Sequence, residues 1–217
     1  MRNSEFPFLN STTMRLFKSV FLIFIILGCS APETFEVGKI ETRLGEAYVW
    51  LYNDTPEHKK AFLELAKGGY FNDYSFNRVI ESFVAQGGCP DTPEGFAYSV
   101  HLLEPEFDAG HRHVYGAFGA GRDANPDKLS AACQFYIVQN EDGLSRLDNN
   151  YMIYGHVFKG MDVIDKIVLV DTDSLDQPTQ EIPLTVSVVE MTASDLQRMG
   201  WDVEKEDAIG ASVRSYE

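Results

Sequence analysis

Three polar side chains in otherwise apolar segments are the first candidates for chemistry in this sequence. Arg78 stands in Phe-Asn-Arg-Val-Ile, Gln86 begins Gln-Gly-Gly, and Gln134 begins Gln-Phe-Tyr-Ile. An arginine stays charged in proteins and presents its donors in a rigid fork, so it can be aimed at a lone pair. The common nucleophile and nucleotide motifs Gly-x-Ser-x-Gly, Cys-x-x-Cys and Gly-x-x-x-x-Gly-Lys are absent from the sequence.

Two histidines form a second candidate site. His111 and His113 have the spacing that places side chains on one face of a strand. Such a pair could ligate a metal, but no third or fourth ligand lies at a recognisable spacing. We therefore expect a solvated or hydrogen-bonded pair, with no metal.

Short apolar and β-branched runs, separated by turn residues, must position these side chains. Two helical stretches interrupt the runs: one begins at Pro56 with Thr55 as its N-cap, and the other covers 160–167. The chain shows no regular alternation of strand and helix, which favours a closed barrel over a parallel sheet. The predicted strand segments are a hairpin over 39–52, a second hairpin over 74–86, and then 133–138, 151–154, 157–158 and 183–190.

The first 29 residues have the pattern of an export signal. A short basic region precedes an apolar run over 20–27, which suits a signal peptide and is too short for a stable membrane span. Leu27-Gly28-Cys29 resembles the bacterial lipobox, in which the chain is cleaved before the cysteine and the thiol is lipidated. A plain signal peptide or a short buried segment is the alternative.

The segments that flank the central region are polar. A short tether over 30–36 follows the signal, and a charged segment with sporadic apolar residues, 192–217, ends the chain. Residues 195–200 could form one or two helical turns, and the remainder is expected to be a loosely held tail. Met14 stands just before the basic region, so residues 1–13 are compatible with a misplaced start codon.

The composition favours one well-packed globular domain and disfavours nucleic-acid binding. Hydrophobic residues make up 44% of the chain, including 15 Phe and 10 Tyr, which is ample material for a single core. The net charge of −15 repels phosphates, and no basic stripe offsets it. Export would place Cys89 and Cys133 where disulfides are permitted, although this alone does not prove that they pair.

Three motif blocks, in order, resemble the cyclophilin family of peptidyl-prolyl cis/trans isomerases. The first runs from Phe76 to Gly88 and contains Phe-x-Arg-Val-Ile, a Phe and Gln-Gly-Gly; the second is Gln134–Ile137, and the third runs from Leu147 to Val157. The resemblance covers about 37–191. It implies an eight-stranded, antiparallel, closed, mainly β barrel capped by two α-helices, with the site on an outer face rather than in the filled interior.

The resemblance implies catalysis of rotation about the peptide bond that precedes proline. Resonance gives that bond a barrier of about 18–20 kcal/mol, and no bond is broken, so no nucleophile, metal or cofactor is needed. The enzyme must hold the twisted amide, in which the proline nitrogen regains its lone pair, better than either planar form. The family pattern gives Arg78 the role of donor to that nitrogen, with Gln86 and Gln134 orienting Arg78 and holding the substrate backbone. A surface salt bridge is the alternative for Arg78.

Seven further positions match substrate-binding positions of the family. Four would form the proline pocket, although ordinary core residues show similar spacing. Two match an edge that would pair with an extended peptide, and one takes the His/Tyr position. The pocket positions are Phe83, Val84, Tyr136 and Leu147. The edge positions are Gly121 and Arg122, and the His/Tyr position is Tyr151.

Several residues depart from the family pattern. Arg146 stands where many members have Trp, Asn77 replaces a frequent His, and 120–122 is Ala-Gly-Arg rather than Met-Ala-Arg or Met-Ala-Asn. These departures bear on substrate preference and turnover more than on reaction type. Cys89 and Cys133 replace a frequent Asp and Ser beside the two site glutamines, and we predict a disulfide between them; two small buried thiols are the alternative.

Two functions are compatible with these observations. The first is an isomerase for exported or envelope proteins, held in the bacterial cell envelope, on the periplasmic face or the cell surface, by lipid on Cys29. The second is a weakly active or inactive chaperone or adaptor that binds proline peptides, which Arg146 and the small residues at 119–121 leave open. The expected partners are proline-containing polypeptides and a membrane, without nucleic acid, and a monomer is expected.

Overall fold

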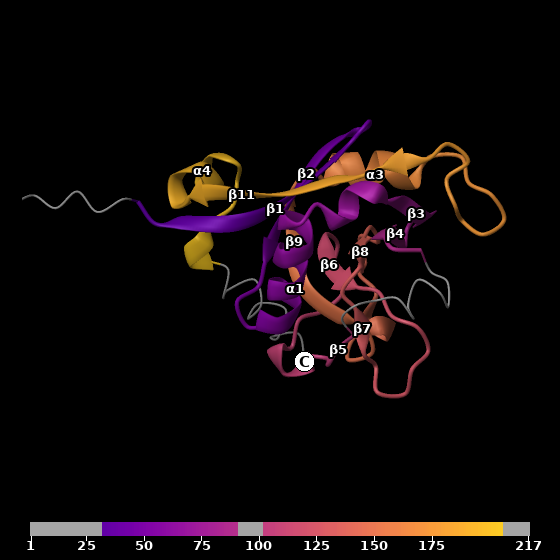
Figure 1. Ribbon diagram of the computed structural model, residues 1–217, viewed down its shortest axis with the longest axis horizontal. Helices are drawn as coiled ribbons and strands as arrows, with labels where there is room; N and C mark the ends of the chain where they lie inside the picture. The colour runs from indigo at the N-terminus through magenta and orange to yellow at the C-terminus, as the bar shows by residue number, and fades with distance from the viewer. Residues whose placement is uncertain (1–31, 91–101, 206–217) are drawn as a thin grey trace, which may run out of the picture. The chain divides into compact units, whose positions relative to one another are not determined.

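The computed structural model describes residues 32–90 and 102–205 (Figure 1). The predicted signal region with Cys29, the first residues of the tether and the last residues of the chain, 206–217, lie outside the described residues. In the described part of the chain, no helix is long and apolar enough to cross a membrane.

Nine strands form one sheet in which every neighbouring pair is antiparallel. The two edge strands are consecutive in the chain, because only Leu184 separates β10 from β11. Leu184 is buried, and its N–H donates to the carbonyl of Tyr74 (2.9 Å). The chain therefore passes from one sheet edge to the other and nearly closes the barrel. In spatial order the strands are β10 (Ile182–Pro183), β3 (Ser75–Ile80), β4 (Val84–Gly88), β8 (Gln134–Val138), β6 (Ala117–Ala120), β9 (Met152–Lys159), β2 (Gly45–Leu51), β1 (Thr34–Thr42) and β11 (Thr185–Thr192).

The predicted mainly β barrel is confirmed, but the predicted count of eight strands is wrong. One predicted closing strand, 183–190, is divided at Leu184: β10 pairs with β3, and β11 pairs with β1. The alternation of apolar and polar residues in this segment does not show which strand each part will pair with. The division therefore cannot be predicted from the sequence. A separate two-stranded sheet pairs β5 (Leu102–Leu103) with β7 (Ser130–Ala131).

Aromatic rings fill the barrel interior, and the two predicted helices pack buried side chains against them. Phe62 of α1 (Pro56–Lys67) lies 5.4, 5.3 and 6.5 Å, between ring centroids, from Phe71, Phe118 and Phe135. The second predicted helix is α3 (Met161–Val168), whose Ile164 and Ile167 are buried in the same cluster. Because side chains occupy the interior, a substrate must bind outside it.

A distant carboxylate, not the predicted Thr55 side chain, caps the start of α1. Thr55 occupies the N-cap position, but its hydroxyl donates to the carbonyl of Tyr52 (3.3 Å). The Glu106 carboxylate accepts from the backbone N–H groups of Glu57 and His58, each at 3.1 Å. A carboxylate at this end also complements the helix dipole, so Glu106 ties its own segment to α1.

Residues 192–205 pack against the barrel, which differs from the predicted loosely held tail. α4 (Ala193–Arg198) begins with a capping box. Trp201, only 5% exposed, lies 5.8 Å from Trp50 and 5.4 Å from Phe158 between ring centroids. The sporadic apolar residues of this segment therefore cover the outer face of β2 and β9. The short 3-10 turns are η1 (Tyr70–Asp73), η2 (Phe107–Ala109), η3 (Ser145–Leu147) and η4 (Val203–Lys205).

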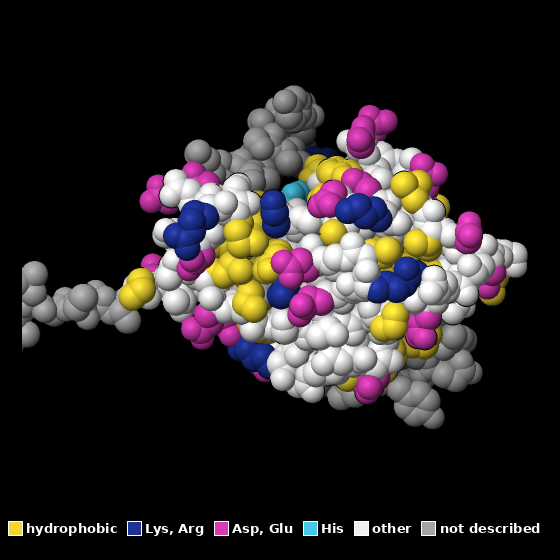
Figure 2. All heavy atoms as spheres, turned by 90° about the horizontal axis from the view of Figure 1, so that it is seen from above, with side chains coloured by type: hydrophobic (Ala, Val, Ile, Leu, Met, Phe, Trp, Pro, Cys, Tyr) yellow, Lys and Arg dark blue, Asp and Glu magenta, His cyan; other side chains and the backbone are white. Residues whose placement is uncertain are grey.

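Charged groups are dispersed on the face of the molecule that Figure 2 shows. Asp and Glu side chains alternate there with Lys and Arg, around patches of apolar atoms (Figure 2). The net charge of −15 is therefore not gathered into one stripe on this face. Among the described residues, the large hydrophobic side chains that are more than half exposed lie on separate segments: Leu102, Leu169 and Leu175.

Candidate active site

One row of residues crosses four neighbouring strands on the outside of the barrel. In the antiparallel register, Arg78 of β3 faces Gln86 of β4, and Gln86 faces Tyr136 of β8. Tyr136 in turn faces Gly119 of β6. Directly opposite residues of paired strands point to the same side, whereas the next residue, Phe135, points into the core. The register therefore places a cation, an amide and a phenol side by side.

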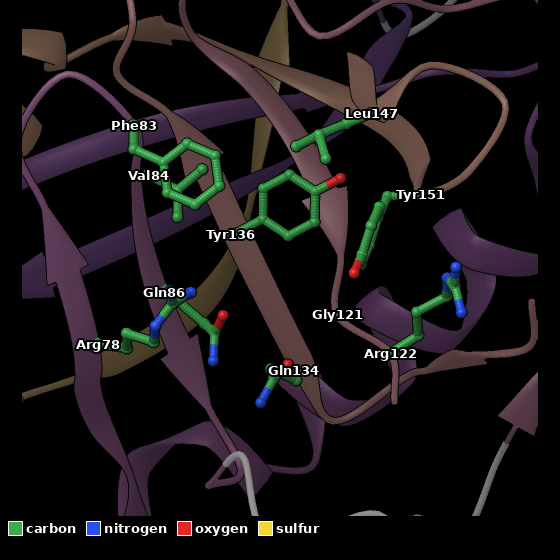
Figure 3. Close-up of a pocket in the computed structure, with 10 residues that line it drawn as sticks. All are labelled: Arg78, Phe83, Val84, Gln86, Gly121, Arg122, Gln134, Tyr136, Leu147 and Tyr151. Carbon is green, nitrogen blue, oxygen red and sulfur yellow. The ribbon is translucent and has the colours of Figure 1, made fainter. Parts of the chain in front are cut away.

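This row forms one wall of a cavity of about 120 Å³. Figure 3 shows Tyr136 between Phe83 and Tyr151, with Gln86 and Gln134 on the side nearer Arg78. All ten residues that the sequence analysis assigned to catalysis or substrate binding line this cavity. They are Arg78, Phe83, Val84, Gln86, Gly121, Arg122, Gln134, Tyr136, Leu147 and Tyr151.

Arg78 is held at the cavity by a loop as well as by its strand. Its Nε lies 3.7 Å from the Asp176 carboxylate, and its guanidinium carbon lies 6.0 Å from the centre of the Phe83 ring. The carbonyl of Asp176 accepts from the N–H of Val79 (2.9 Å), which fixes this loop to β3. The ion pair is half-exposed, so it orients Arg78 more than it stabilises the fold.

The two glutamines are buried but differ in their hydrogen bonds. The Gln134 side-chain N–H donates to the carbonyl of Cys89 (3.0 Å), which fixes that amide. The Gln86 side-chain nitrogen is buried and has no partner among the described residues. A buried donor without a partner is costly, so a carbonyl that enters the cavity would gain this hydrogen bond.

Gly121 contributes space, and its own backbone groups already have partners, so the pairing of the edge at 121–122 with an extended peptide stays a prediction. Its N–H donates to the carbonyl of Gln134 (3.0 Å), and its carbonyl accepts from the N–H of Ala131 (2.8 Å). A Cβ at Gly121 would lie 1.9 Å from the Gln134 side-chain oxygen. An alanine here, as in the family pattern, would require the Gln134 side chain to shift.

Arg122 joins two loops at the edge of the cavity. Its Nε donates to the carbonyl of Asn150 (2.8 Å), and its Nη2 donates to the Asn150 side chain (2.7 Å). Its guanidinium carbon lies 4.6 Å from the centre of the Tyr151 ring. The guanidinium therefore holds Tyr151 and its loop in place.

A buried chain of three polar groups supports Tyr136. Its hydroxyl lies 2.7 Å from Nε2 of His113, and Nδ1 of His113 lies 2.8 Å from Oδ1 of Asp148. The same carboxylate oxygen accepts from the backbone N–H of His113 (2.9 Å). A carboxylate accepts hydrogen bonds, so Nδ1 carries the proton and Nε2 accepts from the Tyr136 hydroxyl.

The surroundings keep this chain in that protonation state. Burial lowers the pKa of His113 below its usual value, and the nearby Asp148 opposes this only in part. Burial raises the pKa of Tyr136 well above its usual value. At neutral pH the imidazole is therefore neutral and the phenol keeps its proton. Gly119 makes room for the ring, because a Cβ there would lie 2.3 Å from the Tyr136 Cζ.

His111 and His113 do not act as a pair. Nε2 of His111 lies 2.7 Å from the Asp54 carboxylate, and its ring stacks on Tyr52 at 3.9 Å between centroids. Both histidines are hydrogen-bonded, as expected, but to different partners. No group of three or more His, Cys, Asp or Glu residues that could hold a metal is found in the described ranges 32–90 and 102–205.

Cys89 and Cys133 form a disulfide that joins the end of β4 to the start of β8. Both residues are buried, and the N–H of Cys89 also donates to the carbonyl of Cys133 (2.9 Å). Since the Cys89 carbonyl holds Gln134, the disulfide fixes the backbone on which that amide depends. The structure thus contains the disulfide that the sequence analysis proposed.

Sequence reasoning missed several residues that support the site. One signal was available: Tyr136 stands at a family position with Phe, and a buried tyrosine hydroxyl usually needs a partner. That signal could not identify the partner, because His113 and Tyr136 are 23 residues apart. No sequence motif marked the others. His113 was named only as a partner of His111, and the residues missed outright are Asp148, Asp176 and Gly119.

Comparisons with known proteins agree with this geometry. The family model for cyclophilin type peptidyl-prolyl cis-trans isomerases matches residues 37–189. A peptidyl-prolyl cis-trans isomerase of Acinetobacter baylyi is 34% identical over 140 residues, which cover 63% of this chain and 73% of that protein. The peptidyl-prolyl cis-trans isomerase-like 1 of Mus musculus is 28% identical over 158 residues, which cover 70% of this chain and 93% of that protein.

A solved structure shares the fold. The cyclophilin type isomerase of Cryptosporidium parvum, crystallised with the dipeptide Ala-Pro, aligns with a TM-score of 0.61 and 22% identity. The alignment covers 70% of this chain and 98% of that one. A mainly β, nearly closed barrel with a cavity on its outer face defines the class of protein. The chain belongs to the cyclophilin type peptidyl-prolyl cis-trans isomerase family and is an enzyme of that class.

Proposed function

We propose that the cavity binds a proline ring against Phe83 and Tyr136 while Arg78 donates a hydrogen bond to the proline nitrogen. The observation that carries this proposal is that Arg78 lines the same cavity as both aromatic residues. A guanidinium that pointed into solvent would support only a surface role. The Cryptosporidium parvum protein was crystallised in the presence of the dipeptide Ala-Pro, which carries the proline that this cavity would bind.

The proposed mechanism stabilises the twisted amide selectively. In a planar peptide bond, resonance draws the lone pair of nitrogen into the C–N bond, which makes that nitrogen a poor acceptor. On twisting, the nitrogen regains the lone pair and can accept from Arg78, so the hydrogen bond strengthens at the transition state. Only interactions that are stronger in the transition state than in the ground state raise the rate.

The buried glutamines hold the peptide during this rotation. The unpartnered Gln86 N–H would donate to a substrate carbonyl on one side of the bond. The packed wall of Tyr136 and Phe83 would keep the proline ring still while the preceding carbonyl turns. A fixed ring and a moving carbonyl are the two requirements for rotation about one bond.

A protease-coupled cis/trans assay on an Ala-Pro-Phe peptide tests this proposal. We expect Arg78→Ala to lower kcat/KM about 100- to 1000-fold, the size of effect seen when one preorganised donor is removed from an active site. Arg198→Ala, which removes an exposed arginine of α4, is the matched control and is expected to retain wild-type activity. Equal rates for wild type and Arg78→Ala would refute the mechanism.

We also propose that the enzyme is exported and attached through lipid on Cys29, and that it acts on exported or envelope proteins. The apolar run over 20–27 before Gly28-Cys29 supports this proposal. The disulfide also suits an oxidising compartment. Expression in a bacterium with radiolabelled palmitate tests it. Label in the wild type and none in Cys29→Ser is expected, and an unlabelled wild type would overturn the lipid anchor.

A further inference from the structure

The rim of the cavity carries an arginine that the reaction does not use. Arg146 lies in η3, beside the cavity residue Leu147, and its side chain is exposed. Its guanidinium carbon lies 5.0 Å from the centre of the Phe83 ring, which is within the range of a cation–π contact. Phe83 is itself a wall of the cavity, so this contact holds a positive charge at the cavity mouth.

The other two arginines of the cavity already have partners. Arg78 lies beside the Asp176 carboxylate, and the Arg122 donors point to backbone carbonyls and to Asn150. Within residues 32–90 and 102–205, Arg146 forms no salt bridge with a carboxylate. Within those ranges no hydrogen bond of its five N–H donors is found either, so they have no polar partner there.

We propose that this site selects proline peptides with an acidic side chain next to the proline, and that Arg146 is the residue that selects them. The proposal rests on the proposed function, because it takes the proline ring to lie against Phe83. A residue next to that proline then passes close to Arg146. A carboxylate there accepts from a guanidinium in a forked, charge-assisted hydrogen bond, whereas a lysine meets like charge.

The acidic surface of the chain does not cancel this preference. The net charge of −15 repels an anionic peptide at long range, but salt at physiological strength screens exposed charges beyond about 8 Å. At contact distance, the nearby guanidinium of Arg146 determines which peptide side chain is preferred. The long-range repulsion acts equally on variants of equal net charge, so comparing the Glu/Lys ratio of Arg146→Gln with that of a control variant of the same net charge removes it.

The test uses matched Ala-x-Pro-Phe and Ala-Ala-Pro-x peptides in which x is Glu, Gln or Lys. In the wild type we expect kcat/KM for Glu to exceed that for Lys by about two- to fivefold, the range of an exposed charge pair. Arg146→Gln should bring this ratio close to one, and Arg146→Lys should retain it in part. Arg146→Glu should invert the ratio. High salt should reduce the wild-type preference.

A control variant separates local from general charge effects. Lys60→Gln removes one exposed positive charge on α1, which contributes no residue to the cavity, and should keep the wild-type ratio. A wild-type ratio in Arg146→Gln, or no preference in the wild type, would overturn the inference. If Arg146→Glu does not fold, Arg146→Gln and Arg146→Lys decide. A wild type that does not isomerise even the Gln peptide would instead refute the proposed function.

Discussion

The two halves of the cavity are built in different ways. A strand half lies on β3, β4 and β8, and a loop half comes from the turns between strands. The strand half is Arg78, Val84, Gln86, Gln134 and Tyr136, and the loop half is Phe83, Gly121, Arg122, Leu147 and Tyr151. The strand half is held by ladder hydrogen bonds with the filled core behind it. The loop half is held by local turn hydrogen bonds, such as that of the Tyr151 N–H to the Leu147 carbonyl, and by the contacts of Arg122 with Asn150.

This difference separates the reaction from the choice of substrate. The residues that would act on the amide bond lie in the strand half, where a small shift would disturb the whole ladder. The departures at Arg146 and 120–122 lie in or beside the loop half. Loops tolerate change, so they are where preference can vary without loss of the chemistry.

The largest effect is expected from the disulfide that joins β4 to β8. The double variant Cys89→Ser/Cys133→Ser should lower the free energy of unfolding by about 3–4 kcal/mol, because the bond closes a loop with a sequence separation of 44. Urea denaturation measures this. Reductant should produce a similar loss in the wild type and none in the double variant. Equal urea midpoints for the wild type and the double variant would show that the stability of the strand half does not depend on this bond.

The second prediction concerns the fit between Tyr136 and β6. Gly119→Val should lower kcat/KM about 100-fold, because a Cβ at this position would lie 2.3 Å from the ring and must displace it. Gly68→Ala is the control, since that glycine follows α1 with an ordinary φ of −76°. Full activity in Gly119→Val would mean that the strand half is not the fixed part of the site.

The third prediction tests the chain that joins the two halves. His113→Ala removes the acceptor of the Tyr136 hydroxyl and should lower kcat/KM about tenfold, since a buried donor loses its only hydrogen-bond partner among the described residues. Adding Tyr136→Phe removes the orphaned hydroxyl, so the double variant should be more active than His113→Ala alone. Additive losses in the double variant would contradict this coupling.

The smallest effect is a dependence on pH. Nε2 of His113 accepts a hydrogen bond only when the ring is neutral, and burial holds its pKa below 6.5. Activity should be constant above pH 6.5 and fall a few-fold as the pH drops through the lowered pKa. Asp148, which Arg112 also approaches at 3.6 Å, and Tyr136 are the other titratable groups facing this ring.

The titration of His113 also makes the free energy of unfolding depend on pH. The folded state binds a proton at His113 less readily than the unfolded chain does. The contribution of the neutral His113 to the free energy of unfolding is therefore complete above pH 6.5 and is lost as the pH falls through the folded pKa. Activity of wild type and Tyr136→Phe between pH 5 and 8 separates the two effects. The variant lacks only the hydrogen bond to the phenol. If its activity falls at low pH as in the wild type, that fall comes from unfolding.

Local strand alternation predicted a β barrel, and the ordered motifs that resemble the cyclophilin family implied the ten residues that line the cavity. The division at Leu184 could not be predicted, since it depends on which strands the two halves meet. The capping of α1 by Glu106 joins residues about 50 positions apart. The packing of Trp201 likewise depends on a surface that only the folded barrel provides.

Exchange NMR spectroscopy of a proline peptide with wild type and Arg78→Ala tests the central claim most directly, because it separates binding from rotation. We predict that the wild type accelerates exchange between the cis and trans signals. Arg78→Ala should still shift the peptide signals on binding but slow the catalysed exchange about 100-fold. Wild-type exchange in Arg78→Ala would contradict the account.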